Sequence, residues 1–225
     1  MRTFGLIGKK LGHSFSKKYF TEKFLRERIQ DAHYELFEIS DISQFPDLLK
    51  QNPNICGLNV TIPYKQEIIP FLDGLDETAQ KVGAVNVVKF TTDGKLIGYN
   101  SDLIGFAQSF QQFCSDWAGK QALVLGNGGA AKAVCVALAD WEIPYQLVSR
   151  QPSANTITYQ DISAEMIGKH AIIINSTPLG MHPQIDTKPD LLYQAIGSQH
   201  FLYDLVYNPE TTAFMEVGLK QGAKV

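Results

Sequence analysis

A glycine-rich segment in the middle of the chain has the residue types and spacing of a phosphate-binding turn. Residues 126–131 read Gly-Asn-Gly-Gly-Ala-Ala, which is G-x-G-x-x-A. The apolar run Ala122–Leu125 before it predicts a strand buried on both faces, and residues 132–139 after it predict a helix. The first glycine can make the tight turn, the second lets a pyrophosphate reach the backbone, and the last alanine permits close helix–strand packing. With the positive end of the helix dipole beside it, the spacing predicts a dinucleotide site; the alternative is a turn needed only for packing.

The end of the next predicted strand bears on which dinucleotide is bound. Arg150 follows the strand Tyr145–Ser149, and no acidic residue occurs before Asp161. An acidic side chain at this position would hold a free ribose 2′-hydroxyl, whereas an arginine accommodates a 2′-phosphate. The sequence therefore favours NADP over NAD, and the plainer alternative for Arg150 is a solvated surface cation.

Polar side chains in the first half of the chain lie around another predicted strand end. Asn59, Thr61 and Lys65 lie at and beyond the end of the strand Ile55–Val60. Open α/β sheets bind ligands at the carboxyl ends of their strands. Taken singly, Lys65 has the plainer explanation of a surface lysine, and Asp102 that of a first-turn carboxylate favoured by the helix dipole. Ser14 and Ser16 have the plainer explanation of loop and cap residues, whereas Asn86 opens a predicted strand, where asparagine is not favoured.

The elements that must position these residues alternate between strands and helices. The predicted strands are 3–8, 33–39, 55–60, 86–91, 95–99, 122–125, 145–149, 171–175 and 201–204. The predicted helices are 16–29, with Ser16 as its cap, 43–50, 76–82, 102–113, 132–139 and 211–220, with a short helix entered at 61–65. The first three strands have a βαβαβ order, which implies parallel pairing. Asp93 and Gly94 predict a hairpin turn between the next two.

We therefore expect an α/β fold made of two α/β domains with a cleft between them. The first domain, residues 1–101, has a mostly parallel sheet, and the second, residues 102–225, is of the Rossmann type. The helix at about 102–113 is the expected linker. The helix at about 211–220 is a candidate for packing back on the first domain.

The composition of the chain excludes several classes of function. The chain has 225 residues and a formal net charge of -3, so nothing suggests a nucleic-acid or membrane partner. No apolar run approaches the length of a membrane helix or of a signal peptide core. Cys56, Cys114 and Cys135 lack C-x-x-C spacing, which argues against zinc and against a disulfide framework. We expect a soluble cytoplasmic protein with reduced cysteines and no metal.

Taken together, the polar blocks of the chain resemble the shikimate dehydrogenase family, in the expected order and over nearly the whole chain. The matching blocks are 14–16, 59–65, 83–86, 98–105, 126–131, and 175–181 with 204–209. The resemblance implies that Lys65 and Asp102 form the catalytic pair. The implied substrate ligands are Ser14, Ser16, Asn59, Thr61, Asn86, Asp102 and Tyr207. The implied NADP ligands are Gly126, Asn127, Gly128, Gly129, Ala130, Ala131, Ser149, Arg150, Thr177, Pro178, Met181 and Leu205.

The resemblance also implies the reaction, which is the reversible reduction of 3-dehydroshikimate to shikimate by NADPH within aromatic amino-acid biosynthesis. The first domain is then the substrate-binding catalytic domain, and the protein is expected to be a monomer or a homodimer with a small-molecule substrate. A lysine ammonium can stabilise charge on the ketone oxygen and deliver the proton, and the sequence leaves open which role dominates. The alternatives are an NAD-using quinate/shikimate dehydrogenase and a non-enzymatic dinucleotide-sensing module, which would not need Lys65 with Asp102.

The chain departs from the family pattern in three places. Lys17, Tyr19 and Phe20 stand where many relatives have Pro and then His-Asn, which bears on substrate preference. Residues 149–151 read Ser-Arg-Gln where the pattern has Asn-Arg-Thr, which bears on the adenosine side of the cofactor. Relatives also continue into a closing helix with a substrate-binding glutamine, and no residue of this sequence matches that glutamine.

Overall fold

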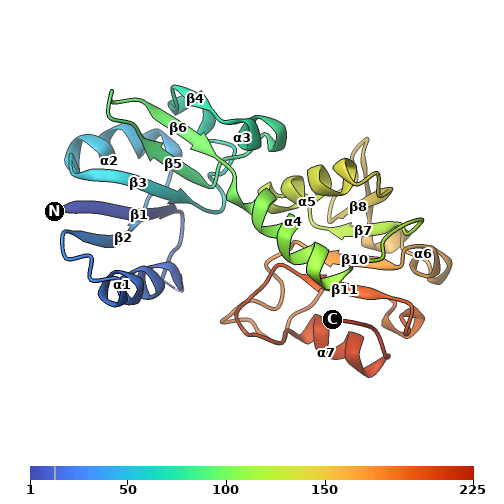
Figure 1. Ribbon diagram of the computed structural model, residues 1–225. Helices are drawn as coiled ribbons and strands as arrows, with labels where there is room; N and C mark the ends of the chain where they lie inside the picture. Colours follow the sequence, from blue (N-terminus) through green and yellow to red (C-terminus); the bar gives the residue numbers. More distant parts are fainter. Residues whose placement is uncertain (13) are drawn as a thin grey trace. The chain divides into compact units, whose positions relative to one another are not determined.

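The computed structural model describes residues 1–12 and 14–225 of the chain (Figure 1). The chain divides into two compact units, Met1–Asp102 and Leu103–Val225. Each unit has its own sheet and its own hydrophobic core, and both sheets are mostly parallel, as the sequence predicts. Helix α4, Ser101–Phe113, begins in the first unit and continues in the second.

The first unit is built on a six-stranded sheet with the order β2-β1-β3-β5-β6-β4. Its elements are β1 (Arg2–Gly8), α1 (Ser16–Arg26), β2 (Ala32–Glu38), η1 (Ile42–Gln44), α2 (Phe45–Gln51), β3 (Ile55–Val60), η2 (Ile69–Phe71), β4 (Gly74–Leu75), α3 (Glu77–Val82), β5 (Val87–Phe90) and β6 (Leu96–Tyr99). Strand β1 pairs in parallel with β2 and with β3, and the hairpin β5–β6 adds antiparallel strands beside β3. The carboxyl ends of β1 and β3 therefore lie side by side, at the point where the strand order reverses.

Alternate side chains of β1 pack on opposite faces of this sheet. Leu6 lies with Tyr34, Phe20 and Phe24 in a cluster under α1, whereas Ile7 lies in a larger cluster on the other face, with side chains of α2 and α3. In Figure 1, α1 and α2 accordingly cover opposite faces. This packing holds α1 against one face of the sheet.

The second unit has a five-stranded, fully parallel sheet with the order β11-β10-β7-β8-β9. After α4 its elements are β7 (Ala122–Leu125), α5 (Gly129–Asp140), β8 (Tyr145–Ser149), β9 (Thr156–Thr158), η3 (Tyr159–Asp161), α6 (Ala164–Lys169), β10 (Ile172–Asn175), η4 (Tyr193–Ala195), β11 (Phe201–Asp204) and α7 (Ala213–Lys220). The chain moves from β7 to β8 on one side and then crosses to β10 on the other. The turn after β7 is thus at the switch point of the sheet, where α/β proteins bind ligands.

Strand β7 is buried on both faces, as its apolar run predicts. Ala122 and Val124 lie in the cluster with α4 and α5, and Leu123 and Leu125 lie in the opposite cluster with α6 and α7. All four residues have no exposed surface. Helix α7 packs through Phe214 and Met215 on the core of its own unit, and its packing on the first domain stays a prediction.

Two local predictions are wrong. Residues 62–68 form consecutive turns rather than a short helix. Pro63 lacks an N–H, and the carbonyl of Lys65 accepts the Val85 N–H at 2.6 Å instead of an intrahelical bond. Ser16 is the first residue of α1 rather than its cap, and its N–H donates to the Ser14 hydroxyl at 3.2 Å. Strand β9 was not predicted, because three residues are too few for a periodic pattern.

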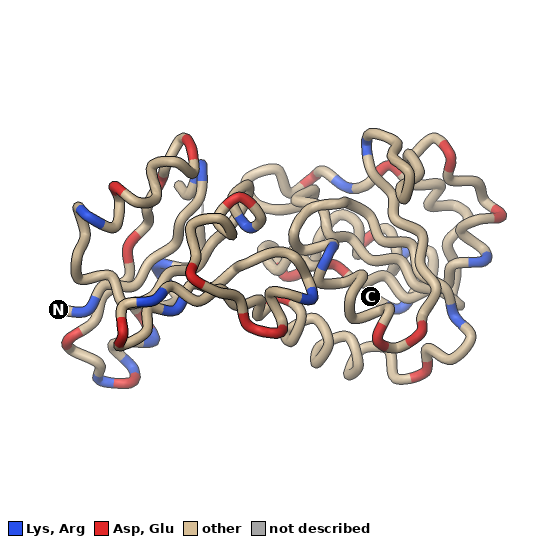
Figure 2. The backbone as a smooth tube through the Cα atoms, turned by 90° about the horizontal axis from the view of Figure 1, so that it is seen from above, with Lys and Arg blue, Asp and Glu red and all other residues tan. Residues whose placement is uncertain are grey.

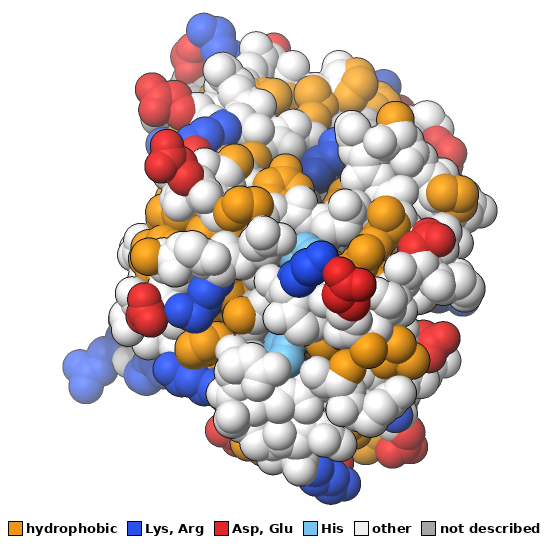
Figure 3. Space-filling view, turned by 90° about the vertical axis from the view of Figure 1, so that its right-hand side faces the viewer, with side chains coloured by type: hydrophobic (Ala, Val, Ile, Leu, Met, Phe, Trp, Pro, Cys, Tyr) orange, Lys and Arg blue, Asp and Glu red, His pale blue; other side chains and the backbone are white. Residues whose placement is uncertain are grey.

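Charged residues of both signs are distributed along the backbone of both units (Figure 2). On the face seen in Figure 3, hydrophobic side chains form small groups separated by polar and charged ones. In the described part of the chain, no helix has the length and apolar character needed to cross a membrane. Residues 1–12 and 14–225 also contain no cluster of three or more histidine, cysteine, aspartate or glutamate side chains that could hold a metal.

Candidate active site

Lys65 and Asp102 form a close charged pair at the carboxyl end of the first sheet. Lys65 Nζ donates to Asp102 Oδ2 at 2.6 Å, and the two side chains are 16% and 29% exposed. Lys65 lies in the turns after β3, and Asp102 lies in the first turn of α4. The pair is therefore half-buried and still open to a small molecule, and the carboxylate fixes the direction of the ammonium group.

Asn86 holds the other oxygen of this carboxylate. Its Nδ2 donates to Asp102 Oδ1 at 2.7 Å and to Ser101 Oγ at 2.9 Å, and its Oδ1 accepts the Ser101 N–H at 2.8 Å. Asn86 is buried at 8% exposure. The Asn86 amide thus forms hydrogen bonds with Ser101 at the start of α4. It also orients Asp102, so that Oδ1 faces Asn86 and Oδ2 faces Lys65. This explains an asparagine directly before a strand.

Backbone hydrogen bonds bring the segments of the site together. The Val85 N–H donates to the Lys65 carbonyl at 2.6 Å, and the Val60 N–H donates to the Asn86 carbonyl at 2.9 Å. The Asn86 N–H in turn reaches the Tyr99 carbonyl at 3.0 Å. The end of β3, the start of β5 and the end of β6 are therefore joined directly around the charged pair.

The remaining predicted substrate residues of the first unit follow β1 or lie on and beyond β3. Ser14 Oγ accepts the Ser16 N–H, so its hydroxyl hydrogen stays available to a ligand. Asn59 Oδ1 accepts the Tyr34 hydroxyl at 2.7 Å, and the Thr61 N–H donates to Ile7 at 2.9 Å. Ser14, Asn59 and Thr61 are only partly buried. Tyr34 was not among the predicted site residues, because a tyrosine in a strand of mixed pattern carries no sign of such a contact.

The glycine-rich turn after β7 has the shape that its sequence predicts. Gly126 has a φ of +108°, and a Cβ atom there would lie 2.8 Å from Ser176 Oγ and 3.1 Å from Thr177 Cγ2. Only glycine fits this position. At Gly128, the N-cap of α5, a Cβ atom would point into open space, and the first turn of α5 has no acidic residue. The turn therefore has both the room and the N–H donors for a pyrophosphate.

Two predicted cofactor residues lie at the end of β8, Ser149 as its last residue and Arg150 directly after it. Ser149 is buried, and its hydroxyl donates to the Gln151 carbonyl, with Thr156 Oγ1 at 3.4 Å from the same oxygen, so that it shapes the loop. Arg150 is exposed and forms no ion pair with any described residue. Burial raises the pKa of Tyr159, and the positive charge of Arg150 opposes that rise. The strand end thus carries the cation Arg150, and residues 151–160 contain no acidic side chain.

A buried amide and a carboxylate hold the two loops that follow β10 and β11. Asn175 Oδ1 accepts the N–H of Thr177 at 3.1 Å and its hydroxyl at 2.7 Å, while its Nδ2 donates to Asp204 Oδ1 at 2.9 Å. Asp204 also accepts the Val206 N–H at 2.9 Å and the Thr212 hydroxyl at 2.6 Å. Burial raises the pKa of Asp204. Asn175 and Asp204 belong to the matching blocks but were not predicted as site residues.

These loops carry the other predicted ligands of the second unit. The Leu205 N–H donates to the Asn175 carbonyl at 2.9 Å, which fixes the start of its loop. Pro178 is exposed, and Met181 and Tyr207 are 46% and 72% exposed. Asn127 is exposed as well, beside the half-buried Gly129 and Ala130 and the buried Ala131. The surface of these loops is therefore open to a ligand.

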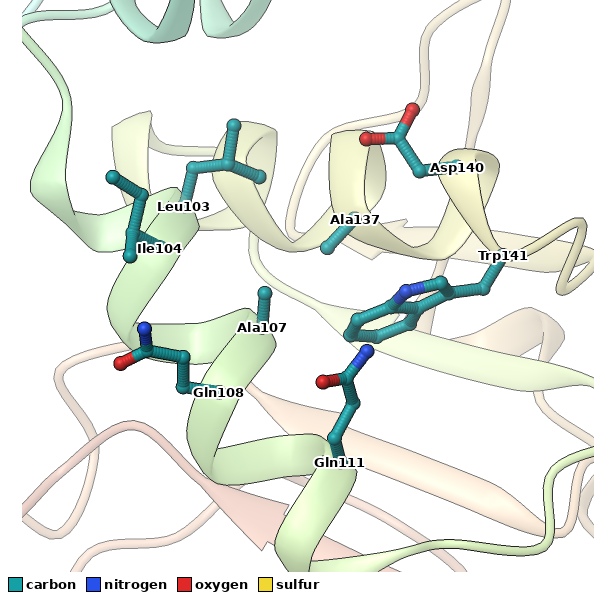
Figure 4. A pocket seen from close by; sticks show the side chains of 8 residues that line it. All are labelled: Leu103, Ile104, Ala107, Gln108, Gln111, Ala137, Asp140 and Trp141. Carbon is teal, nitrogen blue, oxygen red and sulfur yellow. The ribbon is translucent and has the colours of Figure 1, made fainter.

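A separate pocket of about 210 Å³ lies between α4 and α5 in the second unit (Figure 4). The ring of Trp141 and the side chain of Ala137 come from α5 and the residue after it, and Leu103 and Gln111 come from α4. The full lining is Leu103, Ile104, Ala107, Gln108, Gln111, Ala137, Asp140 and Trp141. It contains none of the predicted site residues.

Comparison with known proteins identifies the family. The family model described as the shikimate dehydrogenase substrate binding domain matches residues 6–88. The NADP(+) shikimate dehydrogenase of Clostridium beijerinckii is 40% identical over 237 residues, which cover 100% of this chain and 85% of the relative. The chain belongs to the shikimate dehydrogenase family.

Solved structures of the family have the same fold. Shikimate dehydrogenase 1 from Peptoclostridium difficile is 36% identical, with a TM-score of 0.83 over 100% of this chain and 84% of that one. Shikimate 5-dehydrogenase from Thermus thermophilus, solved with NADP(H) and shikimate, is 26% identical, with a TM-score of 0.81 over 100% of this chain and 86% of that one. The predicted family and the predicted two-domain α/β fold are confirmed.

Proposed function

We propose that the protein catalyses the NADP-dependent, reversible reduction of 3-dehydroshikimate to shikimate, as in aromatic amino-acid biosynthesis. The observation that carries the proposal is the hydrogen bond of 2.6 Å between the Lys65 ammonium and the Asp102 carboxylate, at the carboxyl end of the parallel strand β3. Curated relatives named NADP(+) shikimate dehydrogenase support the same reaction. A module that only senses dinucleotides would have no use for this pair.

Lys65 stabilises the negative charge that develops on the substrate oxygen during the reaction. The bound nicotinamide supplies the hydride, and the electron pair of the substrate C=O bond moves to oxygen as the hydride adds to carbon. Lys65 stabilises the negative oxygen and gives it a proton, which leaves a hydroxyl group. Asp102 keeps the ammonium group directed at that oxygen and accepts a substrate hydroxyl, and Asn86 supports it through Oδ1. In the reverse direction, Lys65 takes the proton back.

The substrate residues divide by chemistry. Ser14 and Ser16 donate hydroxyl hydrogens to the substrate carboxylate, which suits a neutral clamp on an anion. Asn59 and Thr61 bind ring hydroxyls from the end of β3, and Tyr207 contributes from the loop after β11. Asn86 acts on the substrate mainly through Asp102, since its amide is already bonded to the start of α4.

The second unit fits an NADP cofactor. The turn at Gly126, the open approach at Gly128 and the exposed cation of Arg150 support binding of a pyrophosphate and a 2′-phosphate. We assign the pyrophosphate to Gly126, Asn127, Gly128, Gly129, Ala130 and Ala131. We assign the adenosine side to Ser149 and Arg150, and the nicotinamide side to Thr177, Pro178, Met181 and Leu205.

We further propose that residues 1–101 form the substrate domain and residues 102–225 the NADP domain. Helix α4 is the proposed linker, because Asp102 at its start belongs to the catalytic pair. We also propose a cytoplasmic monomer or homodimer. Three cysteines without a disulfide, Cys56, Cys114 and Cys135, are what a reducing compartment favours.

The test is a steady-state assay of the purified chain with four combinations of substrate and cofactor. Reduction of NADP and of NAD is followed by absorbance of the reduced nicotinamide, with shikimate and with quinate. We expect turnover with shikimate, and a higher kcat/KM for NADP than for NAD. A preference for quinate with NAD would instead support the quinate/shikimate alternative. A folded protein that is inactive with all four pairs would contradict an enzymatic role in this reaction.

A further inference from the structure

We infer that Tyr34 is a positioning residue, which fixes the side-chain amide of Asn59 so that its NH₂ group faces the substrate. The inference rests on the proposed function, because Asn59 is there assigned to a substrate hydroxyl. It adds a residue that neither contacts the reacting atoms nor belongs to the matching sequence blocks.

The contact comes from two strands that are not neighbours. Tyr34 lies on β2 and Asn59 on β3, with β1 between them. In the pairing register, Phe4 of β1 lies opposite Tyr34, and Leu6 of β1 lies opposite Asn59. Because side chains two residues apart on a strand point to the same face, the phenol of Tyr34 reaches across β1 on the α1 side of the sheet. Its hydroxyl donates to Asn59 Oδ1 at 2.7 Å.

The phenol ring is held in place by its surroundings. Tyr34 is buried at 3% exposure. The Phe20 ring of α1 stacks on it, with centroids 4.5 Å apart and planes at 9°. Burial raises the pKa of Tyr34, and a hydrogen bond with Ser16 acts against the rise. The buried hydroxyl therefore keeps its proton and donates it to Asn59 Oδ1.

The consequence concerns which half of the Asn59 amide is available. An amide carries an accepting oxygen and a donating NH₂ group. Because Tyr34 occupies the oxygen, the partly exposed side chain offers its two N–H donors to a ligand. The position then selects a ligand oxygen that accepts, and disfavours a group that only donates. Without the Tyr34 hydroxyl, the amide is free to turn, and its oxygen loses a partner in a part-buried place.

The test compares Tyr34→Phe, Asn59→Ala and the double variant with the parent enzyme. Tyr34→Phe keeps the ring and its stacking on Phe20 and removes only the hydroxyl. We expect it to raise the KM for shikimate about 5- to 20-fold, and to leave the KM for NADP within about 2-fold. In the Asn59→Ala background, the same change should alter the KM for shikimate by less than about 2-fold, because the amide that it positions is gone.

A matched control is Tyr193→Phe in the second unit. Tyr193 donates its hydroxyl to the Pro189 carbonyl at 2.8 Å and has no assigned role in the site. Tyr193→Phe removes the same hydroxyl oxygen and a comparable hydrogen bond. The change in its melting temperature therefore shows how much stability such a loss costs. The KM for shikimate of this variant should equal that of the parent.

The outcomes separate the inference from the proposed function. An active parent with an unchanged KM for shikimate in Tyr34→Phe overturns the inference alone. So does a Tyr34→Phe effect that is equally large with and without Asn59, since a general loss of structure is additive. A parent that neither turns over nor binds shikimate overturns the proposed function, and the inference falls with it.

Discussion

Lys65 Nζ and Asp102 Oδ2 lie 2.6 Å apart, although 37 positions separate the two residues in the chain. The turns after β3 bring the first residue to this place, and the first turn of α4 brings the second. Asn86 fixes the second oxygen of the carboxylate at 2.7 Å. The carboxylate is therefore held from both sides, and the ammonium group has one defined direction.

The cofactor preference can be tested at Arg150. This exposed cation follows β8, and no carboxylate accompanies it at the strand end. Loss of a charge-assisted phosphate contact costs about 1.5–3 kcal/mol. Arg150→Ala should therefore raise the KM for NADP roughly 10- to 100-fold and leave the KM for NAD nearly unchanged. Arg26→Ala, which removes an exposed arginine of α1, is the control. Equal losses with both cofactors would show that Arg150 does not bind the 2′-phosphate.

The carboxylate clamp can be tested at Ser14. Its oxygen accepts the Ser16 N–H, so its hydrogen is the part offered to a ligand. Ser14→Ala should weaken shikimate binding by about 1–3 kcal/mol, as for a hydrogen bond to a charged group. Methyl shikimate, which lacks the charge, should be a poor substrate of the parent and should lose much less on mutation. The measurement is kcat/KM for acid and ester in both proteins, and equal losses would place the carboxylate elsewhere.

Asp204 should make stability depend on pH. Its pKa is raised above the ordinary 3.8 by burial, so the folded state holds the proton more tightly than the unfolded state does. Its contribution to the free energy of unfolding is therefore largest below the ordinary pKa and falls as the pH rises through the raised one. Asp204→Asn removes this dependence.

Urea unfolding of the parent and of Asp204→Asn at about pH 4 and about pH 7 measures the effect. We expect the free energy of unfolding of the parent, relative to that of the variant, to be lower at the higher pH. Comparing the two proteins cancels the titration of the other groups. A relative stability that stays constant or rises with pH would contradict a raised pKa at Asp204.

Local sequence patterns predict the elements whose own residues determine them. The four apolar residues of β7 predict a strand buried on both faces, and Asp93 with Gly94 predict the hairpin β5–β6. The turns at 62–68 were missed, because the bond that replaces a helical one comes from Val85, which is distant in sequence from Lys65. Tyr34 could not be found for the same reason, since its partner Asn59 is two strands away.

The same distinction between local patterns and distant contacts applies to the residues of the site. Lys65 and Asp102 were predicted because their blocks resemble a family, and neither residue alone indicates catalysis. The sequence does not reveal that Asn86 commits its amide to Ser101 and Asp102, because only the fold brings the start of β5 to the start of α4. The sequence thus names Lys65 and Asp102 as candidates, but it does not predict the hydrogen bonds that orient them.

Lys65 and Asp102 should act as a unit. Asp102→Asn keeps the size of the side chain and removes its charge, so it should lower kcat, because the ammonium group loses its orientation. The double variant with Lys65→Ala should lose far less than the product of the two single losses, since groups that act together are non-additive. NADP binding, measured by fluorescence titration, should survive in all variants and reports that the Gly126 turn is intact.

The most direct measurement is kcat for shikimate oxidation in Lys65→Ala, with NADP binding as the folding control and Lys89→Ala, an exposed lysine of β5, as the matched variant. We expect Lys65→Ala to lower kcat roughly 10²- to 10⁴-fold, the scale of a positioned acid–base group, with a much smaller change in KM. Lys89→Ala should behave as the parent does. A Lys65→Ala enzyme that binds NADP and keeps most of its kcat would contradict the proposed mechanism.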